Sequence, residues 1–292
     1  MSGVVYTDTQ QGRCSRILPD LIRARGLLWD LISKDFRARY RDARVGVLWA
    51  VLHPLLMTLV LWLVFGVILQ FRVAERGIAT EDPFAVFLLC GIVPWQFLAA
   101  GLAAATASLV RDRDLIKKVY FPREVIPLAA VGSCLVGLVV GLAVLVAARL
   151  ATGGGLSFGA LWALPVLAVQ CVFMAGLALL LSAVHVRYRD VLYIVEILLA
   201  FGFYATPIFY PLSLVEERLP LWLAEHGAPA WLAGAYFANP MAGLVTAYRQ
   251  AFLGNRMPDA DLLVWPIACA CVVLVAGAVV FRRSAPAVAD HL

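Results

Sequence analysis

Residues 45–69 read VGVLWAVLHPLLMTLVLWLVFGVIL, a stretch of 25 residues without Asp, Glu, Lys or Arg. About 20 apolar residues in a helix cross the hydrocarbon core of a bilayer, so this stretch is long enough to span it. In hydrocarbon, every backbone N–H and C=O group must be satisfied within the segment, and a helix achieves this. The stretch therefore predicts a transmembrane helix.

Similar runs along the chain predict a polytopic membrane protein. Residues 84–110, 125–148 and 156–186 also lack charged residues, residues 262–281 form another clean run, and only Glu196 interrupts residues 191–215. Of the 292 residues, 63% are hydrophobic and 15% charged, whereas soluble domains have roughly a half and a quarter. We predict an all-α fold with six transmembrane helices, at about 45–69, 84–110, 125–148, 156–186, 191–211 and 262–281.

The distribution of basic residues predicts the orientation. If the spans alternate in direction, the N-terminal tail, residues 111–124, residues 187–190 and the C-terminus share one side, and they hold 18 of the 24 Lys and Arg. Positive charge accumulates on cytoplasmic loops. We expect a multi-pass protein of the cytoplasmic (inner) membrane with both termini in the cytoplasm, in which tails at 1–19 and 282–292 flank a single transmembrane domain at 45–281.

Residues 20–44 predict an amphipathic helix that lies along the membrane surface. Apolar side chains recur every four residues between basic ones, at Leu28, Ile32, Phe36 and Tyr40. Two opposite-charge pairs sit one turn apart, Asp30 with Lys34 and Asp35 with Arg39. A simple membrane anchor and a helix that contacts a partner are both consistent with this pattern.

Residues 212–248 predict short re-entrant helices on the outer side. They are apolar over much of their length, but Pro229 and the Asn239–Pro240 pair break any continuous helix. A further full span would also place Arg282 and Arg283 outside the cell, against the charge distribution. Broken helices at membrane depth persist where they pack on protein or line a wet cavity.

The sequence lacks the groups that catalysis or nucleotide binding requires. The four histidines lie far apart, at His53, His185, His226 and His291. No G-x-x-x-x-G-K loop is present, and no cluster of His, Cys, Asp or Glu has the spacing of a metal site. We therefore expect no enzyme activity, no metal and no cofactor in this chain, and a separate ATPase as its source of energy.

Two ionisable residues fall inside the predicted spans, where such residues are costly and often functional. Glu196 lies near the cytoplasmic start of its span, so it could form an ion pair with Arg187 or Arg189 or take part in transport. His53 precedes Pro54, so it could be a packed residue at a kink or a proton relay. Both alternatives stay open for each residue.

Five stretches in order resemble a known family: RARYRDARVGVLWAVLHPLLM from residue 37, LIKKVYFPREVIPLA from 115, VRYRDV from 186, YATPIFYP from 204 and NPMAGLVTAYR from 239. They resemble the permeases of type-two ABC exporters for lipid-linked polysaccharides, among them O-antigen, capsule-related and wall teichoic acid exporters. The resemblance runs from about residue 28 to about 281. It implies a homodimer and two nucleotide-binding subunits that bind ATP and Mg and drive export of a polyprenyl-pyrophosphate-linked glycan.

The resemblance also implies roles for particular segments. Residues 20–44 are similar to the interface (gate) helix that touches the ATPase, LIKKVYFPRE to the coupling loop, VRYRD to a second contact, and 212–248 to helices that close the exit. The implied ATPase-coupling residues are Leu115, Ile116, Lys117, Lys118, Tyr120, Phe121, Arg123, Glu124, Arg187, Arg189 and Asp190. A lipid-facing basic loop is the alternative for the stretch at 111–124, which holds five basic and three acidic residues.

Two sets of residues predict contacts with the substrate. Arginine is suited to phosphate, and the predicted headgroup site is Arg37, Arg39, Arg41 and Arg44, which could equally bind anionic membrane lipids. Aromatic faces suit sugar rings, and the predicted pore-lining residues are Trp49, Trp62, Trp95, Phe97, Phe203, Tyr204, Phe209 and Tyr210, which could equally fill the core or belt the interface. We expect no nucleic acid partner; export of a drug or small lipid by the same architecture is the alternative function.

Overall fold

The computed structural model describes residues 23–40, 48–70, 83–118, 121–155, 158–229 and 231–291, the last seven by their backbone alone. These residues contain helices and no strand, which confirms the expected all-α fold. Five of their helices are long and apolar enough to cross a membrane: Leu48–Ile68, Phe84–Arg111, Val125–Ala151, Phe158–Arg187 and Ala260–Ser284. The remaining predicted span is α8 (Val191–Ala205), a shorter apolar helix.

The end of α8 is set by a proline. Thr206 has an extended backbone (φ −103°, ψ 141°) and precedes Pro207, and a residue before proline is pushed out of the helical region. The helix therefore stops six residues before the predicted boundary at 211. Its 15 residues extend about 22 Å at a rise of about 1.5 Å per residue, less than the hydrocarbon thickness of about 30 Å.

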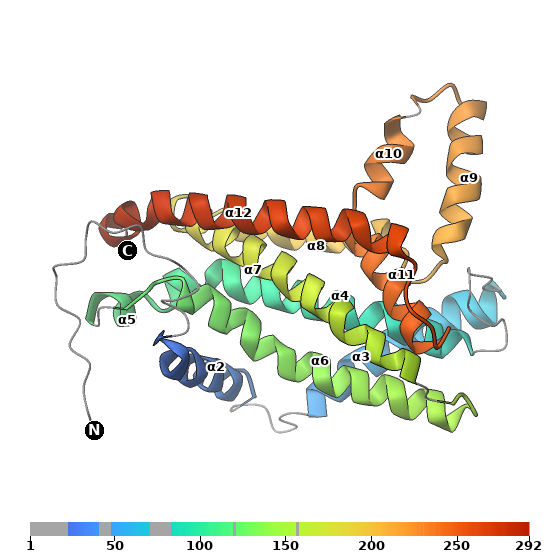
Figure 1. Ribbon diagram of the computed structural model, residues 1–292, viewed down its shortest axis with the longest axis horizontal. Coiled ribbons are helices and arrows are strands. Elements are labelled where there is room, and N and C mark those ends of the chain that lie inside the picture. The colour runs from blue at the N-terminus through green and yellow to red at the C-terminus, as the bar shows by residue number, and fades with distance from the viewer. Residues whose placement is uncertain are drawn as a thin grey trace.

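The centre of the bundle is α4 (Phe84–Arg111). Its most apolar stretch is 78% buried, against 17% for the span formed by α3 (Leu48–Leu61) with the π-helical η2 (Trp62–Ile68) and 17% for α12 (Ala260–His291). Around α4 lie α6 (Val125–Ala151) and α7 (Ala163–Arg187), the latter preceded by the 3-10 turn η3 (Phe158–Trp162). These long helices run side by side along the longest axis of the molecule (Figure 1).

The closest helix pair is α7 with α12, which cross at two glycines. A Cβ atom on Gly176 would lie 2.5 Å from the backbone nitrogen of Leu274, and one on Gly277 would collide with the Gly176 carbonyl group. Small residues allow helix backbones to approach in membranes, where van der Waals packing is a main source of helix association. These glycines therefore fix α12 against α7.

One end of the bundle, here called the α5 end, carries α2 (Arg25–Tyr40) and α5 (Arg113–Lys118). A second apolar cluster joins its elements, with Leu31 of α2, Phe121 before α6 and Phe281 of α12 all buried. The α2 helix lies close against α6, because a Cβ atom on Gly132 would lie 2.8 Å from Ile32. The C-terminal end of α12 (Ala260–His291) lies at this end of the molecule as well (Figure 1).

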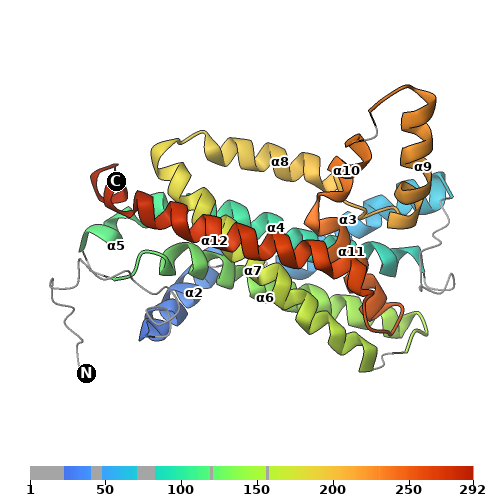
Figure 2. The same cartoon turned by 45° about the horizontal axis from the view of Figure 1, so that its top comes forward.

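The opposite end, here called the α9 end, carries the three helices of the predicted re-entrant region. α9 (Leu212–Glu225) and α10 (Trp231–Phe237) project from the bundle, and Figure 2 shows α8 leading toward them along its upper edge. α11 (Pro240–Phe252) is buried among the long helices. Asn239 caps α11, since its side-chain oxygen accepts a hydrogen bond from the Met241 N–H at 3.0 Å, and Pro240 fits the first helical position.

Candidate functional site

A cleft of about 840 Å³ opens between α3, α4, α6 and α8. Each helix contributes residues three or four positions apart, which share one helical face. The contributing sets are Trp49, His53 and Met57 of α3; Gln96, Ala100 and Ala103 of α4; Cys134, Leu138 and Gly141 of α6; and Glu196, Ala200 and Tyr204 of α8. Arg39 of α2 lines the cleft as well, so the surface helix reaches the space between the spans.

The lining is mostly apolar and carries few polar groups. Among the described lining residues the charged side chains are Arg39 and Glu196. The other polar groups belong to Gln96, His53, Cys134, Tyr204 and the indole N–H groups of Trp49 and Trp95. Alanines on α4 and glycines on α6 leave room, and aromatic side chains stand on α3, α4 and α8. The cleft therefore offers flat apolar faces and a small number of hydrogen-bonding positions.

Five of the eight predicted pore-lining aromatics line this cleft: Trp49, Trp95, Phe97, Phe203 and Tyr204. Trp62, Phe209 and Tyr210 lie outside its lining. Phe209 continues the aromatic row beyond the cleft, since its ring centroid lies 6.1 Å from that of Tyr204 and 4.8 Å from that of Phe65. The assignment of these side chains to a pore stays a prediction.

The loop that follows α8 is held by Arg249 of α11, a fully buried arginine. Its Nη2 donates to the Ile208 carbonyl oxygen at 2.6 Å, and Nη1 donates to that of Tyr210 at 3.4 Å. Its guanidinium also lies 3.5 Å from the centroid of the Phe87 ring, a favourable cation–π position. Arg249, the last residue of the motif NPMAGLVTAYR (239–249), thus binds the motif YATPIFYP (204–211). Both motifs were recognised in the sequence, but no role was predicted there for Arg249.

Hydroxyl and amide groups complete the connection between the loop and the outer helices. Asn239 Nδ2 donates to Thr206 Oγ1 at 2.8 Å, and the Tyr210 hydroxyl donates to the Tyr204 carbonyl oxygen at 2.9 Å and lies 3.0 Å from the Tyr236 hydroxyl. Burial raises the pKa of both Tyr210 and Tyr236 above the usual value for tyrosine. Both phenols therefore stay neutral and keep their hydrogen bonds at physiological pH.

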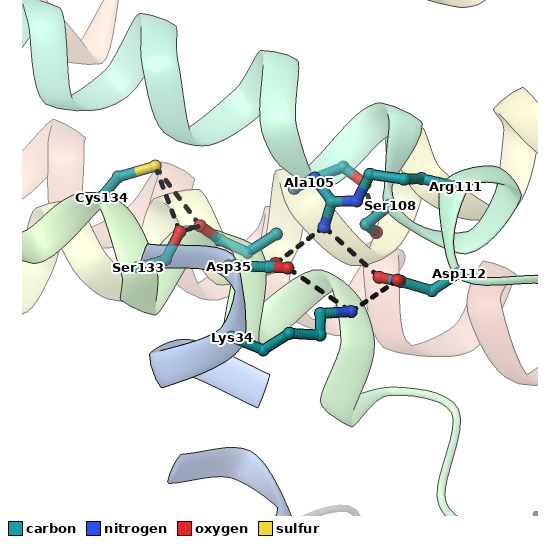
Figure 3. Close-up of polar contacts among 9 residues, drawn as sticks. Lys34, Asp35, Ala105, Ser108, Arg111, Asp112, Ser133 and Cys134 are labelled. Atoms are coloured by element: carbon teal, nitrogen blue, oxygen red, sulfur yellow. Dashed lines mark hydrogen bonds and ion pairs between the residues drawn. The ribbon is translucent and has the colours of Figure 1, made fainter. Parts of the chain in front are cut away.

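At the α5 end, four charged side chains join α2 to the end of α4 (Figure 3). Arg111 Nη2 lies 2.7 Å from Asp35 Oδ2 and 3.3 Å from Asp112 Oδ2, and Lys34 pairs with both carboxylates. The sequence predicts a pair of Asp35 with Arg39, but the Asp35 side chain is turned to Arg111, 76 residues away. That partner could not be found from spacing along one helix.

The predicted coupling residues at 115–124 divide into inward and outward sets. Leu115 and Ile116 of α5 pack against the apolar cluster of the α5 end, and Phe121 is buried in it. Lys117 and Lys118 are exposed. Arg123 and Glu124 are half-buried, and Tyr120 lies outside the described residues. The surface of this loop is thus charged, because its apolar side chains are used to hold the loop on the bundle.

The second predicted contact and the predicted headgroup site are only partly described. Arg187, Arg189 and Asp190 are exposed between α7 and α8, with the Arg187 guanidinium 5.6 Å from the centroid of the Tyr188 ring. Of the arginines before the first span, Arg37 is exposed on α2 and Arg39 lines the cleft. Arg41 and Arg44 lie outside the described residues.

In the part of the chain that the structure describes, six apolar helices form a bundle with a cleft, and charged side chains gather at one end, as expected of a multi-pass membrane protein. Residues 26–253 match the family model described as ABC-2 type transporter, and the chain belongs to this family. It is therefore the membrane part of an ABC transporter, for which an ABC ATPase is the kind of partner.

The names of similar proteins agree with the family. The chain is 30% identical over 267 residues to the O-antigen export system permease protein RfbA of Myxococcus xanthus, covering 91% of this chain and 95% of that protein. It is 26% and 27% identical to two proteins of the same name from Klebsiella pneumoniae, over 235 and 237 residues, or 79% and 80% of this chain and 83% of each relative.

Proposed function

We propose that this chain is the membrane subunit of an ATP-driven exporter that moves a polyprenyl-pyrophosphate-linked polysaccharide across the cytoplasmic membrane. The relatives named above are O-antigen export permeases, and the chain is similar to them over 79–91% of its length. O-antigen is therefore the first candidate among the polysaccharides that the sequence suggests. The observation that carries this proposal is the cleft with its aromatic walls and few charges.

The chemistry of the cleft suits a glycan. A sugar presents hydroxyl groups and apolar ring faces, so a path for it needs aromatic surfaces and hydrogen-bond acceptors more than fixed charges. Trp49, Trp95 and Tyr204 supply such surfaces, and Gln96 supplies an amide. Arg39, at the α2 side, provides a cation for the pyrophosphate of the lipid carrier.

A homodimer would close the cleft. In the single subunit, α3 and α8 border the cleft with many exposed apolar side chains, and Glu196 is exposed between them. An ionisable side chain at membrane depth is costly when it faces lipid, and such residues almost always face protein or a water-filled cavity. A second copy packed on the α3–α8 side would enclose the cleft and give Glu196 an aqueous surrounding.

Two nucleotide-binding subunits would dock at the α5 end, with ATP and Mg held by them and no cofactor in this chain. The exposed Lys117, Lys118, Arg187 and Arg189 offer a basic surface there. Behind that surface, the Asp35–Arg111 pair ties the end of α4, which leads directly into α5, to α2. A movement of the ATPase that displaces the loop at residues 111–124 would therefore also displace α2. Because basic residues accumulate on cytoplasmic segments, we propose that this end faces the cytoplasm and that both termini are cytoplasmic.

The proposal is tested in cells that lack the chain but keep its ATPase. Lipid-linked glycan should accumulate inside these cells and reach the surface again when the wild-type chain is restored. Ala100→Trp, which fills the cleft, should reduce surface glycan while the protein level stays normal. Ala268→Trp, on the exposed face of α12, is the matched control and should not reduce it. If no glycan accumulates without the chain, the substrate is a different one, such as a drug or small lipid.

A further inference from the structure

We propose that Glu196 determines which glycans the cleft accepts: its carboxylate accepts hydrogen bonds from uncharged sugars and rejects glycans whose first sugar carries a carboxylate. This inference rests on the proposed function and specifies the substrate class of the same cleft. It assigns a neutral glycan to this transporter in preference to an acidic one.

Glu196 points into the cleft because of its place on α8. Ala200 and Tyr204 follow it four and eight residues later, share its helical face and line the same cleft. Its neighbour Val195 is buried against the bundle, and Glu196 itself is exposed. The carboxylate therefore stands in the open space between α8 and the aromatic side chains of the facing helices.

The carboxylate is free to bind a ligand. Among the residues that the structure describes, no hydrogen bond or ion pair engages Glu196, and Arg187, one of the two arginines that the sequence offered as partners, lies over the Tyr188 ring. Asp35 shows the contrast, since its carboxylate is occupied by Arg111 and Lys34. A free carboxylate can accept hydrogen bonds at both oxygens, and two neighbouring hydroxyl groups of a sugar supply two donors.

The same group disfavours an anionic sugar. Two negative charges about 5 Å apart repel each other, and with water in the cleft this repulsion corresponds to about a tenfold change in an equilibrium. Arg39 is the cation among the described lining residues, and it stands on α2, across the cleft from α8. A pyrophosphate bound to Arg39 would occupy that cation and leave the first sugar to Glu196. The other titratable groups of the described lining are His53 of α3, Cys134 of α6 and Tyr204 of α8.

The experiment uses the full chain with its ATPase subunits in lipid vesicles. Two lipid-linked oligosaccharides of equal length serve as probes, one with a hexose and one with the corresponding hexuronic acid as the sugar next to the pyrophosphate. The two probes differ in one CH₂OH group replaced by a carboxylate. ATP-dependent translocation is measured for the wild type, Glu196→Gln, Glu196→Asp and the control Glu217→Gln, which removes the same charge from the exposed face of α9.

The wild type should translocate the neutral probe at least about tenfold faster than the acidic one. Glu196→Gln should slow the neutral probe, because an amide accepts fewer hydrogen bonds, and speed the acidic probe, so that the ratio falls below about two. Glu196→Asp should keep the discrimination, and Glu217→Gln should match the wild type for both probes. Equal rates for both probes in the wild type, or an unchanged ratio in Glu196→Gln, would overturn the inference. Failure of the wild type to move either probe would refute the proposed function itself.

Discussion

The Arg111→Gln substitution tests whether the ion pairs at the α5 end hold the surface helix α2 on the bundle. In the structure, Arg111 bonds Asp35 of α2 at 2.7 Å, and Lys34 of α2 bonds Asp112 beside Arg111. Glutamine keeps much of the length of the side chain and removes its charge. Among the described residues, the remaining partner of the Asp35 carboxylate would then be Lys34, whose Nζ lies 3.5 Å away.

The expected loss follows from the burial of the two partners. Exposed ion pairs contribute about 0–1 kcal/mol, and removing one partner of a buried pair costs about 3–5 kcal/mol. The Asp35 side chain is 8% exposed and that of Arg111 is 44% exposed, so this pair lies between the two cases. We expect a coupling free energy of about 1.5 kcal/mol between them in a cycle of Asp35→Asn, Arg111→Gln and the double variant.

Hydrogen exchange of the α2 amides measures this loss, because amide exchange reports the local opening of one helix separately from the unfolding of the bundle. A loss of about 1.5 kcal/mol should speed exchange in α2 by a factor of about ten. Arg113→Gln is the control, since Arg113 and Asp114 lie 3.9 Å apart and are 61% and 82% exposed, so exchange in α2 should not change. If α2 exchanges at the wild-type rate in Arg111→Gln, the ion pairs do not hold the helix and the argument is wrong.

Three further predictions concern packing and the α9 end. Gly277→Ala should destabilise the protein by about 2 kcal/mol, because the new Cβ atom would collide with the backbone of the facing helix α7. Thermal unfolding in detergent measures this loss of stability. The control is Gly234→Ala, whose Cβ atom would have no neighbour within 4 Å and should not destabilise the protein. Arg249→Met should cost about 3 kcal/mol by leaving buried carbonyl groups without a donor, and should make residues 206–211 sensitive to protease; resistance like that of the wild type would contradict it. Burial raises the folded-state pKa of Tyr210 and Tyr236 above that of unfolded tyrosine, which is about 10. Their contribution to the free energy of unfolding is therefore complete below about pH 10 and falls as the pH rises further. Tyr236→Phe should reduce that fall, as measured by unfolding between about pH 8 and 11.

The helices could be predicted from the sequence because their signals are local. An uncharged run of about 20 residues specifies a spanning helix whatever surrounds it. The breaks were also visible, since Asn239–Pro240 carries both the cap and the first-turn proline of α11. The boundary of α8 was placed too late because the apolar run continues through Pro207, and composition outweighed the rule that a helix ends before a proline.

The contacts that organise the site could not be predicted, because each joins distant parts of the chain. Arg111 and Asp35 are 76 residues apart, and Arg249 lies 41 residues from Ile208. Residue types suggested which aromatics could line a cleft, but the helix rotations that include Trp95 and exclude Trp62 depend on packing. The same holds for Glu196, whose sequence neighbours suggested an arginine partner and whose helical face turns it to the cleft instead.

The short length of α8 explains why Arg249 is buried at so high a cost. A helix of 15 residues ends within the hydrocarbon thickness, so the backbone of residues 206–211 leaves the helix where water is scarce. Carbonyl groups there need donors from protein, and a buried guanidinium supplies several in a fixed geometry. The charge of that guanidinium is in turn stabilised by two carbonyl oxygens and the face of Phe87. The buried Arg249 and the loop at residues 206–211 are thus each unfavourable alone and stable together. They make the segment after α8, at one end of the cleft, a rigid unit. α9 and α10 pack mainly on each other, so they are its least constrained neighbours.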